Sequence, residues 1–332
     1  MTKKNASKVL GGKFNDFVGS ITDETIKKAV RHNTIITGGA VANLLSEIDV
    51  NDYDIYFRDK ATCELVARYY VKMFNDVRPE GKIKPWIEVS DDRIKINLCK
   101  QGVIIEEGVV VKEGGKIKYG IVSENHKSGD VTPAIENNPD SEEMIDSEVT
   151  SEVDRDMIEA EGRDGTASVE EVKPKYRPIY ITDNAITLSG KVQLITRFYG
   201  EPEEIHKNFD YQHCCGYWTS WEGKVLADAD TLECLLNKEL RYRGSLYPVS
   251  SIIRMRKFIK RGWKINAGNM LKPIFQVSLL DLTDLKVLEE QLIGVDSAYF
   301  KSIIDYCRQK QKKDVGWTLN YEYLSEILDR IF

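Results

Sequence analysis

The chain has 332 residues, of which 42% are hydrophobic and 30% are charged, and its formal net charge at pH 7 is −6. A chain of this length can bury a sizeable core in one large or two ordinary domains. No apolar run approaches the ~20 residues of a membrane-spanning helix, and no apolar segment of signal-peptide length follows the basic start. We therefore expect a cytoplasmic protein with no membrane partner, while the oligomeric state stays open.

The net charge is unevenly distributed along the chain. Residues 124–171 contain 16 acidic and three basic residues, a net charge of −13, so the rest of the chain carries +7 when −13 is subtracted from −6. This segment has no Phe, Trp or Tyr, and it cannot bury enough apolar surface to offset chain entropy, which predicts a disordered insertion. A basic remainder suits a nucleotide or nucleic-acid substrate.

The six cysteines form no C-x-x-C pair, which argues against a zinc site and favours reduced thiols. His213 stands beside Cys214 and Cys215, but neighbouring residues of a strand face opposite ways. We therefore expect these three side chains to pack in a core rather than to bind a metal together.

The first predicted elements lead into a central motif. Residues 1–20 carry few signals beyond Phe14 and Phe17, and we expect a short helix or a packing arm. The Thr-Asp-Glu-Thr run at residues 22–25 is typical of a helix start, and this helix is predicted to end near Arg31.

The central motif occupies residues 34–57. Residues 34–36 are β-branched and predict a short strand. Gly38 and Gly39 predict a tight turn at which the backbone can approach a ligand closely. Residues 40–48 follow with apolar side chains at helical spacing, which predicts a short helix.

The motif ends in a second predicted strand, residues 52–57. Asp52 and Asp54 are two residues apart, so their side chains lie on the same face of that strand. Two carboxylates so placed repel each other unless a cation lies between them, and Mg²⁺ is the usual ion. The alternative is a surface turn followed by a strand with two solvated acids.

The rest of the chain divides into an α/β part and a helical part. Before the acidic segment we predict a helix at 61–74, strands at 85–89 and 93–98, and a β-rich hairpin at 103–122. After it we predict a strand at 191–199, a short helix at 201–206 and a strand at 208–218 that pairs with 221–226. From Asp230 the apolar period is helical, with helices at 230–240, 249–260, 279–292, 299–309 and 321–331.

A Gly-Gly turn, a short helix and Asp-x-Asp on a strand together resemble the core of the polymerase-beta-type nucleotidyltransferase superfamily, which includes CCA-adding enzymes and poly(A) polymerases. The resemblance covers residues 34–57 well and residues 180–218 loosely, where the pattern is similar to that of large-virus and phage-type members. Ala42 and Asn43 stand where CCA-adding enzymes carry Arg-Asp. This departure argues against a CCA-adding enzyme and leaves the nucleotide open, with ATP among the candidates.

The resemblance implies a fold and a division of the chain. The expected fold class is α+β, a nucleotidyltransferase-type mixed sheet with helices, followed by an α-helical C-terminal domain. Residues 1–123 and 172–228 would form the catalytic domain, 124–171 the acidic disordered insertion, and 229–332 a helical substrate-binding domain.

The resemblance also implies roles for the central motif. The backbone of Gly38 and Gly39 would hold the triphosphate, with a hydroxyl contact from Thr37. Asp52 and Asp54 would bind two Mg²⁺ ions, with Mn²⁺ as the alternative metal. The function implied is transfer of a nucleoside monophosphate from an NTP to a hydroxyl, preferably at the 3′ end of RNA. The alternatives are a protein or small-molecule acceptor, or a non-catalytic nucleic-acid-binding protein on the same fold.

A third catalytic and metal-binding carboxylate is expected on a later strand. The resemblance assigns it to Asp210, in Phe-Asp-Tyr, with a turn residue as the alternative reading. Glu88 is the second choice, since it also lies on a predicted strand after the acid pair.

A predicted helix supplies candidate phosphate contacts. Residues 254–264 carry six basic residues, and Arg254, Lys257 and Arg261 are the expected nucleotide-binding side chains, although a run of bases is often only a solvated face. Asn184 is expected to contact the sugar or base. Weaker candidates in the same roles are Gln193, Arg241, Arg243 and Lys272.

Overall fold

The computed structural model describes residues 1–78, 84–91, 93–97, 109–113, 116–120, 175–292, 304, 307–314 and 317–325. The chain forms two compact units, the first of Met1–Lys100, Val169–Asp281 and Glu290–Val295, the second of Gln101–Ser168, Leu282–Glu289 and Asp296–Phe332. The sheet and the candidate site belong to the first unit, which extends through helices of the predicted C-terminal domain. The predicted acidic insertion lies outside the described residues, and the three-part domain division stays a prediction.

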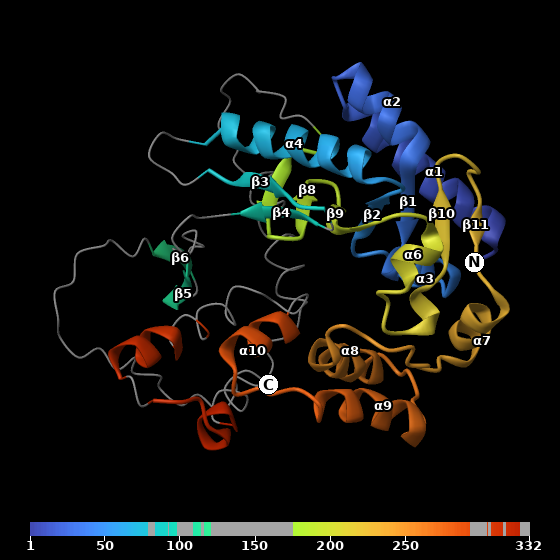
Figure 1. Ribbon diagram of the computed structural model, residues 1–332. Coiled ribbons are helices and arrows are strands. Elements are labelled where there is room, and N and C mark those ends of the chain that lie inside the picture. Colours follow the sequence, from blue (N-terminus) through green and yellow to red (C-terminus); the bar gives the residue numbers. More distant parts are fainter. Residues whose placement is uncertain are drawn as a thin grey trace. The chain divides into compact units, whose positions relative to one another are not determined.

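A seven-stranded mixed sheet is the framework of the first unit, with strand order β11-β10-β1-β2-β9-β8-β7 (Figure 1). Its strands are β1 (Thr34–Thr37), β2 (Tyr53–Phe57), β7 (Pro178–Ile181), β8 (Ala185–Leu188), β9 (Val192–Tyr199), β10 (Tyr217–Thr219) and β11 (Val225–Leu226). β2 pairs in parallel with β9, with Asp54 opposite Gln193, while the other neighbours are antiparallel. The predicted α+β fold class is confirmed.

Helices from the first 76 residues cover one face of this sheet. They are α1 (Lys3–Ser20), α2 (Glu24–Asn33), α3 (Gly39–Leu45) and α4 (Lys60–Asp76), and α2 and α4 lie side by side in Figure 1. Asp23 and Asp59 cap α2 and α4 by accepting from backbone amides. The core beneath the helices includes Ile36 on β1, and Ile55 and Phe57 on β2.

The opposite face of the sheet carries a much smaller apolar cluster. Ile35 and Tyr56 alternate with the core residues along β1 and β2, so they point to this face, where they meet Ile205 of α6 (Pro202–His206). Because Asp54 is two residues from Tyr56 on β2, its carboxylate lies on the same face.

Further helices follow the last strands, namely α7 (Ala229–Asn237), α8 (Pro248–Lys260), α9 (Ala267–Val277) and α10 (Leu285–Gln291). They confirm a helical region after the sheet, although α9 was not predicted. Pro273 inside α9 obscures its pattern in the sequence, while Asn266 caps the helix by accepting from an amide of its first turn.

On α7, Leu235 is buried and Leu236 is 85% exposed. The helices predicted at 299–309 and 321–331 are described in part, at 307–313 and 321–325.

Two hairpins complete the described elements. β3 (Trp86–Val89) pairs with β4 (Ile94–Asn97), and β5 (Val109–Glu113) pairs with β6 (Lys116–Gly120). The strands of the first were predicted without their pairing, the second was predicted as a hairpin, and both lie outside the seven-stranded sheet.

The predicted strand at 208–218 is wrong over most of its length. A single 3₁₀ turn, η2 (Gln212–Cys214), interrupts it, and within the described residues β10 is the part of this range that forms a strand of the sheet. The reason is that consecutive side chains are all buried: Tyr211 and His213 pack against Phe258 of α8, and Gln212 bonds to other partners. A strand would send alternate side chains to opposite faces.

Within the described part of the chain, none of the helices combines the length and the apolar character needed to cross a membrane.

Candidate active site

The turn between β1 and α3 is built around Gly38. This residue has φ +79° and ψ −142° and stands directly before α3, a conformation that is essentially restricted to glycine. A Cβ built on Gly38 would lie 3.4 Å from Asp54 Oδ2 and 3.9 Å from the ring of Phe209, whereas one on Gly39 would meet nothing within 4 Å. The Gly38 turn, Asp54 and the segment that leads to Asp210 are therefore neighbours.

Asp52 and Asp54 form an acid pair at the start of β2. Burial, followed by the negative charge of Asp52, raises the pKa of Asp54 to about 7. Burial also raises the pKa of Asp52, and the positive charge of Lys191 opposes that rise. Within the described residues neither carboxylate has an ion-pair partner. The pair therefore holds more negative charge than the protein around it neutralises, which is the condition of a cation site.

Asp210 lies on the other side of the same region and is held by an arginine. Arg254 Nε on α8 donates to Asp210 Oδ2 at 2.7 Å, and the two side chains are 32% and 12% exposed. The charges of Asp54 and Asp210 both raise the pKa of Cys214, after burial. Phe209, which directly precedes Asp210, lies beside the Gly38 turn and Asp54, so the structure brings Asp210 into the neighbourhood of the acid pair.

The three predicted acids do not form a compact cluster here. Among the described residues, no group of three or more His, Cys, Asp or Glu side chains is arranged to hold a metal ion. Glu88 lies on β3, outside the main sheet, where its carboxylate accepts from Asn97 Nδ2 at 2.7 Å. Asp52 and Asp54 are thus the carboxylates that could hold a cation together, and Arg254 already occupies one oxygen, Oδ2, of Asp210.

Thr37 is buried, with both hydrogen-bonding functions of its hydroxyl engaged. Thr37 Oγ1 donates to the carbonyl of Gly216 at 2.8 Å, so it must accept from His206 Nε2, also at 2.8 Å. Burial, and next the charge of Arg243, lowers the pKa of His206 to about 4, so the ring is neutral at pH 7. This bond ties the end of β1 to α6, and its only signal in the sequence was a histidine near Asp210.

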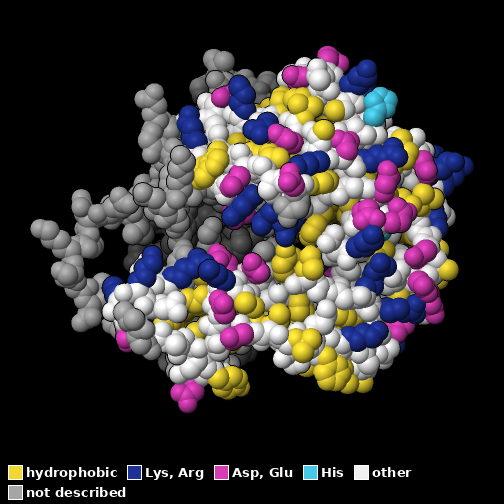
Figure 2. All heavy atoms as spheres, viewed as in Figure 1, with side chains coloured by type: hydrophobic (Ala, Val, Ile, Leu, Met, Phe, Trp, Pro, Cys, Tyr) yellow, Lys and Arg dark blue, Asp and Glu magenta, His cyan; other side chains and the backbone are white. Residues whose placement is uncertain are grey.

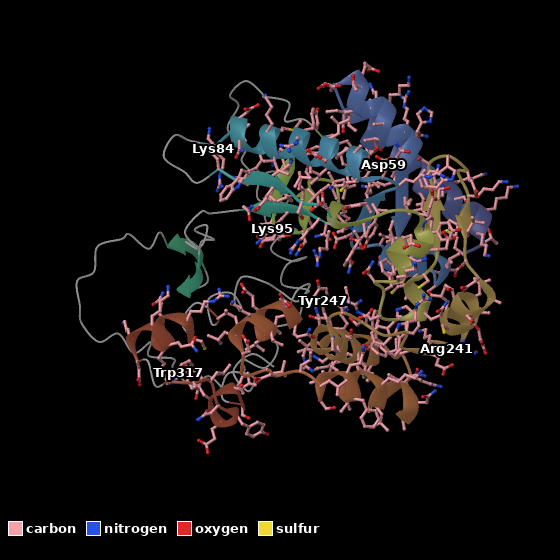
Figure 3. The ribbon with its side chains drawn as sticks, viewed as in Figure 1. Asp59, Lys84, Lys95, Arg241, Tyr247 and Trp317 are labelled. Carbon is pink, nitrogen blue, oxygen red and sulfur yellow. The ribbon has the colours of Figure 1, made fainter. Side chains whose placement is uncertain are left out.

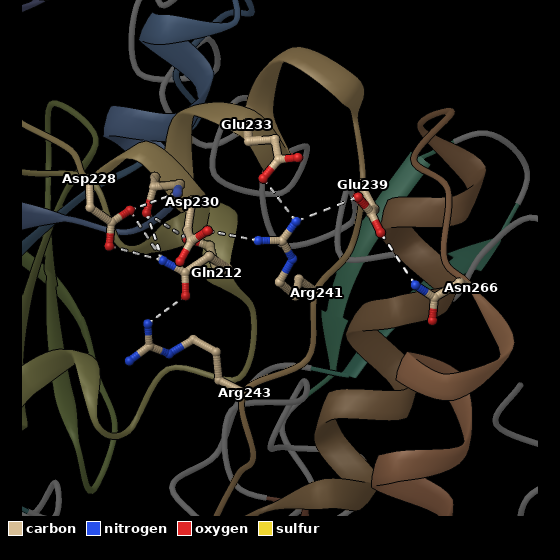
Figure 4. Close-up of polar contacts among 9 residues, drawn as sticks. Gln212, Asp228, Asp230, Glu233, Glu239, Arg241, Arg243 and Asn266 are labelled. Atoms are coloured by element: carbon tan, nitrogen blue, oxygen red, sulfur yellow. Dashed lines mark hydrogen bonds and ion pairs between the residues drawn. The ribbon is translucent and has the colours of Figure 1, made fainter.

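The segment after Asp210 is fixed by polar contacts (Figure 4). Gln212 Nε2 donates to Thr231 Oγ1 at 3.0 Å and to the carboxylate of Asp228, while Arg243 Nη1 donates to Gln212 Oε1 at 2.6 Å. The same view shows Arg241 in a surface network with Asp230, Glu233 and Glu239. Arg243 therefore supports the site, and Arg241 is already neutralised by acids.

His213 packs as expected among aromatic rings. Its ring centroid lies 4.1 Å from that of Trp263 and 4.5 Å from that of Phe258, and burial lowers its pKa to about 3. Its Nε2 contacts Cys214 Sγ at 3.2 Å.

The predicted phosphate and sugar contacts are dispersed over the first unit. Of the α8 bases, Arg254 meets Asp210, Lys257 is half-buried and Arg261 is exposed at the helix end. Asn184 lies between β7 and β8, where it accepts from Arg93 Nη2 at 3.2 Å. On the face shown in Figure 2, basic and acidic side chains are intermixed rather than gathered into one field.

Gln193 and Lys272 are the remaining weaker candidates. Gln193 stands opposite Asp54 on β9, so it is adjacent to the acid pair. Lys272 lies on α9, where Nζ donates to Asn269 Oδ1 at 3.3 Å.

The comparison with protein families gives one match. The model of the family described as "Gabija anti-defense 2 family protein" matches residues 8–238 of this chain. No curated protein matches the chain.

Solved structures of tRNA-processing enzymes are similar to this chain at low identity. The Thermotoga maritima CCA-adding enzyme complexed with tRNA has 11% identity and a TM-score of 0.39, covering 93% of this chain and 55% of that one. The Bacillus stearothermophilus CCA-adding enzyme in complex with CTP has 13% identity and a TM-score of 0.33, covering 88% and 51%. A tRNA-processing enzyme with CTP has 12% identity and a TM-score of 0.36, covering 90% and 60%. The chain thus spans little more than half the length of these enzymes.

Proposed function

The chain belongs to the Gabija anti-defense 2 family, and within it we propose that this protein is a metal-dependent nucleotidyltransferase that moves a nucleoside monophosphate from an NTP to a hydroxyl. The observation that carries the proposal is the adjacency of the Gly38 turn to the Asp52–Asp54 pair, with Asp54 Oδ2 3.4 Å from the position of a Cβ on Gly38. A glycine turn that opens a helix offers backbone amides to phosphate oxygens, and paired carboxylates offer oxygens to a hard cation.

The donor set fits Mg²⁺ or Mn²⁺. Asp52 and Asp54 would hold the ion, since they provide two oxygen ligands whose mutual repulsion it would relieve. The bound metal would neutralise the charge on the phosphate oxygens. Asp210 would be a third ligand through Oδ1, or through Oδ2 if that oxygen leaves Arg254.

The proposed reaction is an in-line displacement at the α-phosphorus of the NTP. The amides of the Gly38 turn would orient the triphosphate, and Asp210 would accept the proton of the attacking hydroxyl. The acceptor oxygen forms a bond to the α-phosphorus while the bond from that phosphorus to the bridging oxygen breaks, and pyrophosphate leaves. No covalent protein intermediate is needed.

Two classes of acceptor are proposed. The 3′ end of RNA is the preferred one, because the residues outside the acidic segment carry net positive charge and suit a polyanion. The family's description favours a second candidate, a component of the Gabija defence that carries the accepting hydroxyl. A non-catalytic nucleic-acid-binding protein would use the same net positive charge without turnover.

The test follows pyrophosphate release and label transfer. The full chain is incubated with each of the four α-labelled NTPs and Mg²⁺ or Mn²⁺, with an RNA pool or with purified Gabija proteins as acceptor. We expect label on one acceptor class and none with Asp52→Asn/Asp54→Asn. The matched control is Asp49→Asn, which removes a neighbouring exposed acid and should keep full activity.

Three results would decide against nucleotidyl transfer. The first is that no NTP is consumed with any acceptor, and the second is that the double variant is as active as the parent. The third is that Asp49→Asn loses as much activity as the double variant. Retention of RNA binding without turnover would favour the non-catalytic alternative.

A further inference from the structure

Arg197 is a half-buried arginine whose polar contacts are incomplete. It lies near the end of β9, four residues beyond Gln193, the partner of Asp54. Its Nη2 donates to the hydroxyl of Tyr247 at 3.0 Å, and its guanidinium carbon is 5.7 Å from the ring centroid of Phe198. Its Nε is shielded from water and has no hydrogen-bond partner in the described part of the chain.

Two other arginines of the first unit, Arg254 and Arg58, are paired with carboxylates. Arg254 pairs with Asp210 at 2.7 Å, and Arg58 pairs with Glu201 at 2.5 Å. Within the described residues Arg197 has no such ion pair. A half-buried guanidinium without a counter-ion is costly, so the group is suited to an anion that reaches its solvent-facing edge.

The neighbours of Arg197 place it beside the candidate active site. Tyr247 directly precedes Pro248, the first residue of α8, and is labelled in Figure 3. Tyr247 is the residue before the first turn of α8, and Arg254 lies within that helix seven residues later. The helix and its N-cap residue therefore contact both Asp210 and Arg197.

We propose that Arg197 binds a phosphate group, oriented for it by Tyr247. The planar guanidinium presents donors in a fork that matches phosphate oxygens. The Tyr247 bond holds Nη2, and Nη1, which is not shielded from water, stays available to the phosphate within the described part of the chain. The phosphate would belong either to the nucleotide or to the backbone of a nucleic-acid acceptor. The choice between these sources rests on the proposed function, but the anion site itself does not.

The experiment measures binding without turnover. Inorganic tripolyphosphate and a labelled single-stranded RNA oligonucleotide are titrated separately into the full chain, at low salt and without NTP. Arg197→Gln should weaken the binding of one probe about tenfold, the scale of a charge-assisted hydrogen bond to phosphate. Loss of tripolyphosphate affinity assigns the nucleotide as the source, and loss of RNA affinity assigns the acceptor.

Arg58→Gln is the matched control, since it removes an arginine from the same unit that already has a carboxylate partner. It should change neither affinity more than about twofold. Tyr247→Phe removes only the orienting hydroxyl and should weaken the same probe as Arg197→Gln, by a smaller factor.

The ligand-free melting temperature separates a binding role from a structural one. Because Arg197→Gln removes a half-buried charge without a counter-ion, its melting temperature should be equal to or above that of the parent. A fall larger than that of Arg58→Gln would make Arg197 structural and overturn the proposal. Unchanged affinity of Arg197→Gln for both probes, or a parent that binds neither, would also overturn it. Nucleotidyl transfer is tested by turnover, so the two proposals can fail separately.

Discussion

The ion pair between Arg254 and Asp210 makes a quantitative prediction about stability. Replacing Arg254 with Met keeps an aliphatic stem and removes the charge, so it leaves Asp210, which is 12% exposed, without its counter-ion. Breaking a buried pair costs about 3–5 kcal/mol, and breaking an exposed pair costs about 0–1 kcal/mol. Because the Arg254 side chain is 32% exposed, we expect a loss of about 2 kcal/mol.

A double-mutant cycle isolates the interaction within that loss. In Asp210→Asn/Arg254→Met neither charge is present, so the double variant should lose clearly less stability than the sum of the two single variants. The matched control is Arg241→Met, because Arg241 is similarly exposed, at 33%, but faces acids that are 69% and 54% exposed. It should lose less than about 1 kcal/mol.

The assay is urea denaturation followed by tryptophan fluorescence at pH 7, repeated at 0.1 and 0.5 M NaCl. Salt should reduce the effect of Arg241→Met more than that of Arg254→Met, because an exposed pair is screened more strongly. Two results would refute the reasoning. One is that Arg254→Met lowers the free energy of unfolding no more than Arg241→Met does. The other is that the losses of the two single variants simply add in the double variant.

Three further predictions concern the turn, the acid pair and a buried histidine. Gly38→Ala should cost about 1–3 kcal/mol in urea denaturation because of its backbone conformation, and Gly39→Ala, the control, should cost little; equal losses would contradict this. The pKa of Asp54 is raised to about 7. The contribution of Asp54 to the free energy of unfolding is therefore largest below its unfolded pKa near 4 and is lost as the pH rises to 7. With chelator, Asp54→Asn should therefore melt higher than the parent at pH 8 and equally at pH 4; equal melting at both pH values would contradict it. The pKa of His213 is lowered to about 3, so its effect on stability has the opposite pH dependence. Its contribution to the free energy of unfolding is fully present above pH 6.5 and is lost as the pH falls toward 3. His213→Leu should flatten the acid side of the melting profile, and an unchanged slope would show that the histidine does not titrate on unfolding.

The sequence predicted those elements whose residue types and spacing agree with their backbone. β1, β2, α4 and β9 stand close to their expected positions because β-branched, aromatic or apolar residues recur along each of them at strand or helix spacing. The segment at 208–218 failed because its side chains enter two different environments, so apolar content did not imply extended backbone. α9 was missed because its interior proline removes one of the signals used to recognise a helix.

The candidate site was predicted in its local part only. Gly38, Asp52 and Asp54 lie within 17 residues of one another, counted from 38 to 54, and local spacing was enough to suggest their adjacency. The bond from His206 to Thr37 and the ion pair from Arg254 to Asp210 join residues 169 and 44 positions apart. Such contacts depend on how α6 and α8 pack against the sheet, which residue spacing does not encode.

The parallel pairing of β2 with β9 has a consequence for how the protein is made. Asp54 stands opposite Gln193, 139 positions later when 54 is subtracted from 193, so the central strand of the acid pair gains this neighbour only after most of the chain exists. Strand pairs of such long sequence separation form slowly, because the entropy cost of closing the loop comes before the stabilising contacts form. On the ribosome, where about 5–20 residues are added each second, the nascent chain would carry its two aspartates for roughly ten seconds or more before the neighbouring strand emerges. A product terminated before β9 would contain the complete Gly-Gly and Asp-x-Asp motifs and still lack the sheet that positions their residues.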